Sequence, residues 1–197
     1  MRLKSKNLLT LFLCTASFFY AINDVSAEKK AQEIKEYKIK DIVLQIPASW
    51  KQSKPTSRLR LAQFKVPVTE GDLFKTELQV FNFGGGGGGF AANIKRWENQ
   101  FSKEGRQSTL TKGTCPQGDY YFLDITGTYN MSVGPPFQRK TEACKKARML
   151  AVILQMKGNK GNYFLKLPGT QETVKGIVED FRASFGANEK KETAVKR

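Results

Sequence analysis

The segment MLAVILQMKGNKGNYFLKLPGT, residues 149–170, carries the clearest signal for the fold of this protein. Residues 149–156 are almost entirely apolar, as in a central strand that is buried on both faces of a sheet. The segment 157–161 contains two glycines and has the length of a hairpin connection. The strand after it carries three large apolar residues on one face: Tyr163, Leu165 and Leu167. We therefore expect two neighbouring antiparallel strands at the centre of the protein.

A helix is predicted directly after these strands. Thr170 is a typical N-cap residue, Glu172 lies in the first turn, and Gly186 follows the last periodic residue. The apolar residues between them recur with a helical period: Val174, Ile177, Val178, Phe181 and Phe185. We expect this stripe to pack against the sheet.

The rest of the chain indicates further strands and one more helix. Alternating apolar residues predict strands over 37–46, 58–66, 75–83, 107–112 and 120–129. A helix is expected over 91–102, ended by Gly105, and a long loop over 130–147. In the strand 120–129 we expect Tyr121, Leu123 and Ile125 to face the core, with Tyr120 and Phe122 under a helix. Hairpin-length connections favour an α+β fold, a mainly antiparallel sheet with helices packed on its faces.

Residues 1–27 have the three parts of a secretory signal peptide. The basic residues at its start are Arg2, Lys4 and Lys6. An apolar run over 8–22 is shorter than the ~20 residues of a membrane-spanning helix, and Ala27 ends a suitable cleavage site. We expect an exported protein, periplasmic or extracellular, without a transmembrane segment after cleavage. A retained membrane anchor is the alternative.

The length of the chain fits one domain. After the signal peptide we expect a flexible lead-in over 28–36, a single α+β domain over 37–186 and a charged disordered tail over 187–197. The formal net charge of +15 falls to +13 on cleavage, because residues 1–27 contain three basic residues and one acidic residue. Such a charge predicts weak attraction to anionic surfaces and no specific nucleic-acid recognition.

Two cysteines follow the predicted cleavage site, Cys115 and Cys144. An even number in an oxidising compartment favours one disulfide. If 120–129 and 148–157 pair as antiparallel strands, however, the two cysteines lie near opposite ends of the pair. A disulfide needs Cα atoms within about 7 Å, so the sequence leaves this bridge open.

Histidine is absent from this chain and cysteine is rare. The chain has no histidine, which excludes Ser-His-Asp and Cys-His catalysis and every histidine-containing metal site. Two cysteines alone do not complete a zinc site. The carboxylates Asp119, Asp124, Glu142 and Asp180 are scattered without local pairing, and surface solvation is their expected role. We expect no catalytic residue, no metal and no cofactor.

Six consecutive glycines, residues 84–89, join a predicted strand to a predicted helix. Backbone N–H groups and the helix dipole favour anions at such a position. The candidate anion-binding residues are Gly87, Gly88, Gly89, Asn93 and Arg96. Six glycines satisfy any glycine motif, and Phe90 stands where a P-loop requires lysine. The alternative is a flexible or close-packed connection that exploits the backbone freedom of glycine.

Three segments resemble known families. Ile46-Pro47-Ala48-Ser49-Trp50 resembles the strand-Pro-x-x-Trp opening of the PsbP/Mog-like superfamily, and 60–64 resembles the arginine-bearing strand after it. The glycine run followed by Asn93-x-x-Arg96-Trp97-x-x-Gln100-Phe101 is similar to a group of uncharacterised exported bacterial proteins. The resemblance covers roughly 37–185 and implies an antiparallel sheet sandwiched by helices. Known members are non-enzymatic helpers, one at a photosynthetic manganese–calcium centre and one on a small nuclear GTPase, and neither partner suits this chain.

Two interpretations of function follow. The first is an exported, non-enzymatic binding or accessory protein that recognises another protein or an envelope component. The second is binding of an anion, a phosphate or an acidic glycan, at the glycine-rich loop and the helix after it. An enzyme acting through carboxylates has the least support.

Overall fold

A computed structural model of the protein describes residues 32–55, 57–72, 74–84, 87–134, 136–138 and 140–196. They belong to one compact unit that begins at Gln32. The predicted signal peptide lies outside the described residues, as does the predicted lead-in up to residue 31.

An antiparallel sheet forms the centre of this unit. Its strands are β3 Lys51–Ser53, β4 Arg60–Lys65, β5 Glu77–Asn82, β6 Gln107–Cys115, β7 Gly118–Ser132, β8 Thr141–Met156, β9 Asn162–Thr170 and β10 Thr193–Ala194. They lie in the order β10-β6-β7-β8-β9-β5-β4-β3. A separate hairpin consists of β1 Ile34–Ile39 and β2 Ile42–Pro47. The α-helices of the described residues are α1 Phe90–Glu98 and α2 Gln171–Phe185, and short 3-10 turns occupy Pro136–Gln138, Lys157–Asn159 and Glu189–Lys191.

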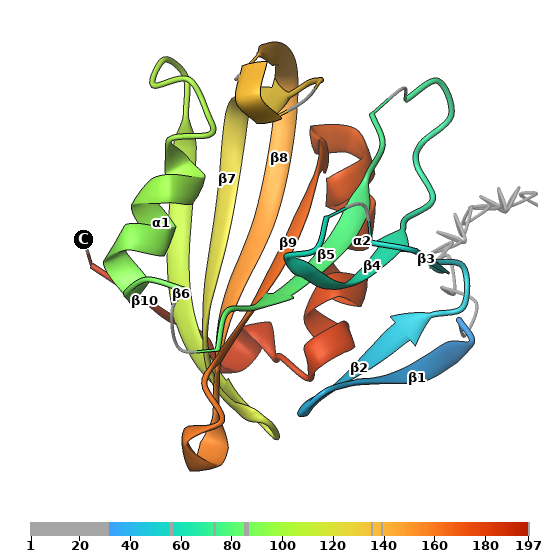
Figure 1. The fold of residues 1–197 in the computed structure, drawn as a ribbon, viewed down its shortest axis with the longest axis vertical. Coiled ribbons are helices and arrows are strands. Elements are labelled where there is room, and N and C mark those ends of the chain that lie inside the picture. Colours follow the sequence, from blue (N-terminus) through green and yellow to red (C-terminus); the bar gives the residue numbers. More distant parts are fainter. Residues whose placement is uncertain are drawn as a thin grey trace, which may run out of the picture. The chain divides into compact units, whose positions relative to one another are not determined.

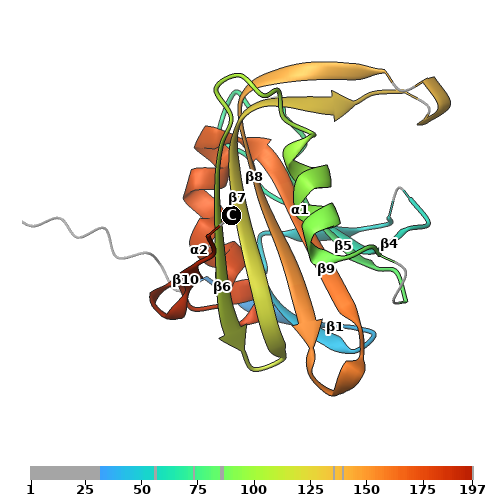
Figure 2. The same cartoon turned by 90° about the vertical axis from the view of Figure 1, so that its left-hand side faces the viewer.

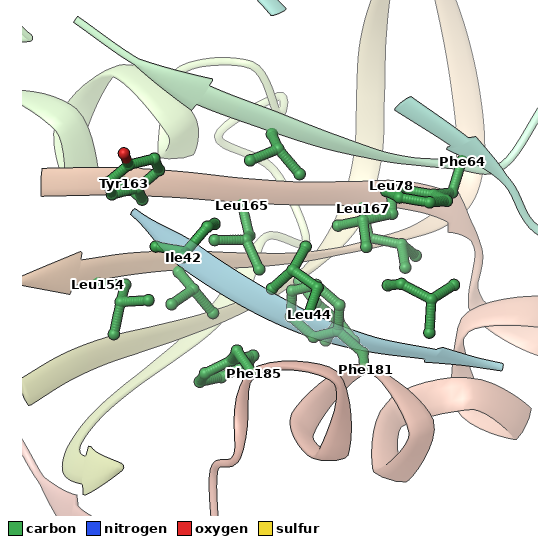
Figure 3. Packing of buried hydrophobic residues seen from close by; sticks show 14 of the residues in the cluster. Ile42, Leu44, Phe64, Leu78, Leu154, Tyr163, Leu165, Leu167, Phe181 and Phe185 are labelled. Atoms are coloured by element: carbon green, nitrogen blue, oxygen red, sulfur yellow. The ribbon is translucent and has the colours of Figure 1, made fainter. Parts of the chain in front are cut away.

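The sheet lies between two layers. Figure 2 shows it with α2 on one side and α1 on the other. The α2 side also carries the β1–β2 hairpin, and Figure 3 shows Leu44 of β2 beside Phe181 of α2. The α1 side has its own buried cluster, which includes Ile94 and Trp97. These layers confirm the predicted α+β class, an antiparallel sheet with helices on its faces.

The strand predicted at 149–156 is confirmed as the buried part of β8. Alternate residues join different clusters: Leu150, Val152 and Leu154 on the α2 side, and Met149, Ala151 and Ile153 on the α1 side. The hairpin at 157–161 is confirmed as well, because β8 and β9 pair from Gln155 and Asn162 onward. Burial on both faces explains why this stretch lacks a polar stripe.

The signals at both ends of α2 are confirmed. The hydroxyl of Thr170 accepts a hydrogen bond from the backbone N–H of Thr173 at 3.3 Å. Gly186 ends the helix with a φ of 83°, in the left-handed region that favours glycine. Beneath the helix, Tyr120 packs edge-on against Phe185. The tyrosine and its neighbour Phe122 thus lie under a helix as predicted.

The single strand predicted over 37–46 is wrong, because this segment contains two strands. The chain reverses at Lys40, which has a φ of 52°, and at Asp41. The side chain of Asp41 accepts a hydrogen bond from the hydroxyl of Tyr163 at 2.9 Å and anchors the turn to β9. Residues 34–36, predicted as lead-in, form the start of β1.

The predicted end of the first helix is also wrong. Helix α1 ends at Glu98 and does not reach Gly105. Beyond it, Phe101 forms an isolated bridge with Tyr129, and the N–H of Asn130 donates to the carbonyl of Gln100 at 2.8 Å. The chain leaves the helix early because its backbone groups find partners on β7.

The long loop predicted over 130–147 is mostly strand. Strands β7 and β8 remain paired as far as Ser132 and Thr141. Most of the segment is exposed, and the side chains that reach the buried cluster on the α1 side, Met131, Cys144 and Ala147, do not alternate regularly along it. Its backbone groups pair with each other, which satisfies them without burial of a core.

The tail predicted to be disordered is ordered in its described part, up to residue 196. Thr193 and Ala194 pair with Lys112 and Thr111 at the edge of the sheet. Glu192, just before them, forms an ion pair with Arg182 of α2. The charged composition of this segment is compatible with order because its contacts come from α2 and β6.

The candidate disulfide is not formed, since Cys115 and Cys144 are both free. Cys115 lies opposite Gly118 at one end of the β6–β7 hairpin. Cys144 lies opposite Tyr129, eleven residues further along β7. At about 3.3 Å per residue of strand, this separation far exceeds the reach of a disulfide.

Candidate functional site

A cleft of about 310 Å³ opens beside α1 on its face of the sheet. Figure 1 shows α1 over the β6–β7 side of the sheet, away from β5 and β4. Because α1 has only nine residues, it leaves part of this face uncovered. The cleft is lined by residues of α1, β5 and β9, by Gln100, and by Leu59 just before β4. We call it the α1 cleft.

Aromatic side chains form a connected series along this cleft. The ring centroids of Phe81 and Phe83 are 6.0 Å apart, those of Phe83 and Phe164 5.5 Å, and those of Phe164 and Trp97 6.2 Å. Phe164 and Trp97 are buried, whereas Phe81 and Phe83 are partly exposed. Leu59 is 62% exposed and completes the apolar lining. This wall offers a ligand apolar surface with defined geometry.

The polar part of the cleft is centred on Lys166. Its Nζ donates to Oε1 of Gln100 at 2.5 Å and to the hydroxyl of Tyr129 at 3.0 Å. It also stands 5.3 Å from the centre of the Tyr129 ring. In the sheet register Gln79 lies opposite Lys166, and Gln63 lies opposite Gln79. Polar residues therefore run across three strands on this face, and on β4 the Gln63 amide also contacts Arg60 and Glu77.

The charges near Lys166 are not balanced. Burial, followed by the positive charges of Arg60 and Arg96, lowers the pKa of Lys166 to about 8. Arg60 is 3.7 Å from the carboxylate of Glu77. In the part of the chain that the structure describes, neither Lys166 nor Arg96 is within ion-pair distance of a carboxylate. The cleft therefore carries a local positive charge that an anion would offset.

The residues predicted as an anion site do lie together at the start of α1. Asn93 is fully buried, and its Nδ2 donates to the carbonyl oxygens of Gly87, Gly88 and Gly89 at 2.8, 3.2 and 3.1 Å. Its Oδ1 accepts a hydrogen bond from Arg96. The Asn93 amide is thus directed at the loop backbone, and it fastens the loop to the helix.

Two glycines of this loop have a structural requirement. A Cβ on Gly87 would lie 2.9 Å from the Phe83 ring and 3.0 Å from the Phe164 ring. Gly88 has a φ of 77°. The close packing at Gly87 and the left-handed backbone at Gly88 agree with the expectation that the glycine run is a close-packed connection between strand and helix. Of the five predicted anion-site residues, Arg96 alone also lines the α1 cleft.

Lys166 and Gln100 are residues that the sequence analysis did not select as site residues. A signal for Lys166 does exist, because it is the only charged residue in 161–170. A lysine within a strand with a buried apolar face must lie on the opposite face. That it meets Gln100 and Tyr129 there depends on the register of three strands and on the end of α1, which no local pattern reveals.

A second cavity, of about 790 Å³, lies at the N-terminus of α2. Its central carboxylate, Asp72, accepts hydrogen bonds from Thr170 at 2.5 Å and from Thr173 at 2.6 Å. The N–H of Phe74 also donates to Asp72, at 2.8 Å. Burial raises the pKa of Asp72, but these hydrogen bonds outweigh it and the net pKa lies below its usual value. Asp72 thereby anchors its loop to α2, and the α1 cleft remains the stronger candidate.

The described residues contain no group of three carboxylate or cysteine side chains placed to hold a metal ion. Across the same ranges, no helix combines the length and the apolarity needed to cross a bilayer. What the α1 cleft itself supplies is a set of hydrogen-bond donors beside an aromatic wall. Such an arrangement can hold and orient a ligand.

Comparison with known proteins gives structural matches only. No family model matches this chain, and no curated protein is significantly similar to it. Among solved structures, the chain is similar to the cyanobacterial PsbP of Synechocystis sp. PCC 6803, with 15% identity, a TM-score of 0.46, and coverage of 88% of this chain and 99% of that one. It is also similar to a protein of unknown function from Pseudomonas aeruginosa, described as a putative regulator, with 13% identity, a TM-score of 0.41, and coverage of 77% and 92%.

Proposed function

We propose that this chain is a non-enzymatic binding protein and that the α1 cleft holds an anionic group of its ligand. The observation that carries the proposal is the Lys166 ammonium, which lies in an apolar cleft beside Arg96 with no carboxylate partner among the described residues. Removing a cation from water is unfavourable unless an opposite charge or strong hydrogen bonds compensate. An anionic ligand supplies that charge.

The surroundings of Lys166 favour binding over catalysis. Its hydrogen-bond partners are an amide and a phenol, Gln100 and Tyr129. Burial raises the pKa of Tyr129 to about 12, so this phenol stays protonated at neutral pH. Acid–base and nucleophilic catalysis need a second reactive group beside such an amine, and the described residues that line the cleft include no carboxylate, cysteine, serine or threonine. Turnover of any member of a hydrolase substrate panel by the purified protein would contradict the proposal.

Thermal unfolding in the presence of anions tests the binding site. A ligand that binds only the native state raises its melting temperature by mass action. We expect an anion-dependent increase at physiological salt in the unmodified protein and none in Lys166→Met or Arg96→Gln. Lys95→Gln is the matched control, because Lys95 is exposed on α1 and does not line the cleft. Equal shifts in all four proteins would show that the anions act through general surface charge.

The N-terminus of α1 is a second position for the same anion. Gly88 and Gly89 are exposed there, and Gly89 is the N-cap of the helix. The variant Gly88→Val tests this position, because Gly88 does not line the cleft, and Lys166→Met tests the cleft. If Lys166→Met retains binding and Gly88→Val loses it, the anion lies at the glycine loop and not in the cleft.

We also propose that the chain is exported, to the periplasm or beyond, and that its partner is a protein or an envelope component. The support is the charged start, the apolar run and the small residues that end at Ala27. N-terminal sequencing of the protein recovered from the producing cells checks this. A mature chain that begins at Glu28 is expected, and an intact N-terminus at Met1 in the cytoplasmic fraction would overturn it.

A further inference from the structure

We infer that the ligand of the α1 cleft is an amphiphilic organic acid, whose acidic group meets Lys166 and Arg96 and whose apolar body lies along the aromatic wall. This inference rests on the proposed function and narrows its ligand class. It excludes inorganic phosphate and acidic polysaccharide as the preferred ligands.

The aromatic wall is the first reason. Its rings follow one another from Phe81 through Phe83 and Phe164 to Trp97, all with centroids within 6.2 Å of the next. On β5 and β9 the order is set by register, since Phe81 lies directly opposite Phe164. Leu59, which is 62% exposed, adds apolar surface to the same cleft. Burial of this surface by an apolar ligand is favourable, whereas a hydrated inorganic anion would leave it in water.

The donors near Lys166 are the second reason. An ammonium group has three N–H donors, and two of those on Lys166 are directed at Gln100 and Tyr129. One donor is left for a ligand. Arg96 is exposed on α1 and lines the same cleft, so its guanidinium can add to the recognition of an acid. These donors of Lys166 and Arg96 suit a ligand with one acidic group and not a polymer with a series of acidic groups.

Size is the third reason. The cleft has a volume of about 310 Å³, which lies at the small end of the range for ligand sites, about 300 to 1,000 Å³. A polysaccharide chain needs an extended groove with repeated charges. The lining of the α1 cleft combines two cations with two glutamines and five apolar side chains, which matches a small molecule with one acidic and one apolar part.

Isothermal titration calorimetry of the purified protein with three probes tests this inference. The probes are naphthoate, its uncharged amide naphthamide, and inorganic phosphate, all at physiological salt. We expect naphthoate to bind at least about tenfold more tightly than either of the others, because it alone offers both a charge and an apolar body. In Lys166→Met the advantage of naphthoate over naphthamide should disappear. Leu59→Ser should weaken naphthoate binding and leave the melting temperature unchanged.

Tryptophan fluorescence locates the bound probe. The chain has two tryptophans: Trp97 packs against the wall residue Phe164, and Trp50 lies in the buried cluster on the α2 side of the sheet. We expect naphthoate to change the emission of the unmodified protein and of Trp50→Phe equally. A change that is lost in Trp50→Phe would place the probe on the wrong face and overturn the inference.

The outcomes separate this inference from the proposed function. If phosphate binds as tightly as naphthoate and both depend on Lys166, the cleft is an anion site and the amphiphilic ligand is wrong. If naphthamide binds as tightly as naphthoate, the cleft is apolar and the charge plays no part. If none of the probes binds, both proposals fail. Melting temperatures of Lys166→Met and Arg96→Gln show whether each variant is folded, and loss of naphthoate binding in folded Arg96→Gln also supports the inference.

Discussion

The carboxylate of Glu192 accepts two hydrogen bonds from the guanidinium of Arg182, from Nε at 3.0 Å and from Nη2 at 3.1 Å. The same carboxylate accepts from the hydroxyl of Thr111 at 2.6 Å and from that of Tyr120 at 3.2 Å. The Glu192 side chain is 3% exposed. One residue of the C-terminal segment thus connects α2, β6 and β7.

Glu192→Gln should lower the free energy of unfolding by about 3 kcal/mol, because it leaves the Arg182 charge buried without its partner. Urea unfolding measures this loss. Glu189→Gln is the matched control: Glu189 lies 3.6 Å from the same arginine but is 61% exposed, and its loss should be under about 1 kcal/mol. A loss for Glu192→Gln as small as the loss for Glu189→Gln would mean that the C-terminal contact is dispensable.

The contribution of Glu192 should also depend on pH. Burial raises the pKa of this carboxyl, but hydrogen bonds from Arg182 and Thr111 outweigh it and place the net pKa below 4.5. A group with a lowered folded-state pKa stabilises the protein above the unfolded pKa and stops doing so as the pH falls through the folded one. The difference between the unmodified protein and Glu192→Gln should therefore shrink below about pH 4.5. A difference that stays constant down to about pH 3 would contradict this account.

The charge of Lys166 should lower the stability of the folded protein, whereas the charge of Glu192 raises it. Its pKa is lowered from 10.5 to about 8, so the folded protein binds the proton less tightly than the unfolded chain does. Its charge therefore costs stability below about pH 8, and the cost disappears as the pH rises to about 10.5. Without ligand, Lys166→Met should be more stable than the unmodified protein at neutral pH, and the gap should narrow over that range. Unfolding curves at several pH values check this, and a variant that is less stable at neutral pH would show that the hydrogen bonds of Lys166 outweigh its charge.

Asn93→Ala should lower the free energy of unfolding by about 2 kcal/mol, because the carbonyls of the glycine loop lose the donor that the fully buried Asn93 amide supplies. Asn99→Ala is the control, since Asn99 is exposed at the other end of the same helix. Differential scanning calorimetry of both variants measures the difference. If Asn93→Ala is as stable as Asn99→Ala, the contacts of Asn93 with Gly87, Gly88 and Gly89 do not hold the loop.

Much of the fold is predictable from local sequence. The apolar run 149–156 predicts a strand that is buried on both faces. Thr170 and Gly186 predict the two ends of α2, and they are its N-cap and C-cap residues in the structure. The candidate site is harder to predict from the sequence. The sequence predicts Arg96 as an anion-site residue at the glycine loop. Arg96 does line the cleft, but at the loop the Asn93 amide faces the backbone.

Local sequence predicts the elements whose side chains repeat with the period of their own backbone, because burial of one face or of both leaves a pattern in the chain. Three features depend on the tertiary structure: the β7–β8 extension to Ser132 and Thr141, the C-terminal segment on β6, and the meeting of Lys166, Gln100 and Tyr129. In each, polar or exposed residues are held by partners distant in sequence. Backbone pairing and isolated polar contacts between such segments produce no periodic pattern of apolar residues in the sequence. These three features therefore depend on strand register and on the packing of the elements.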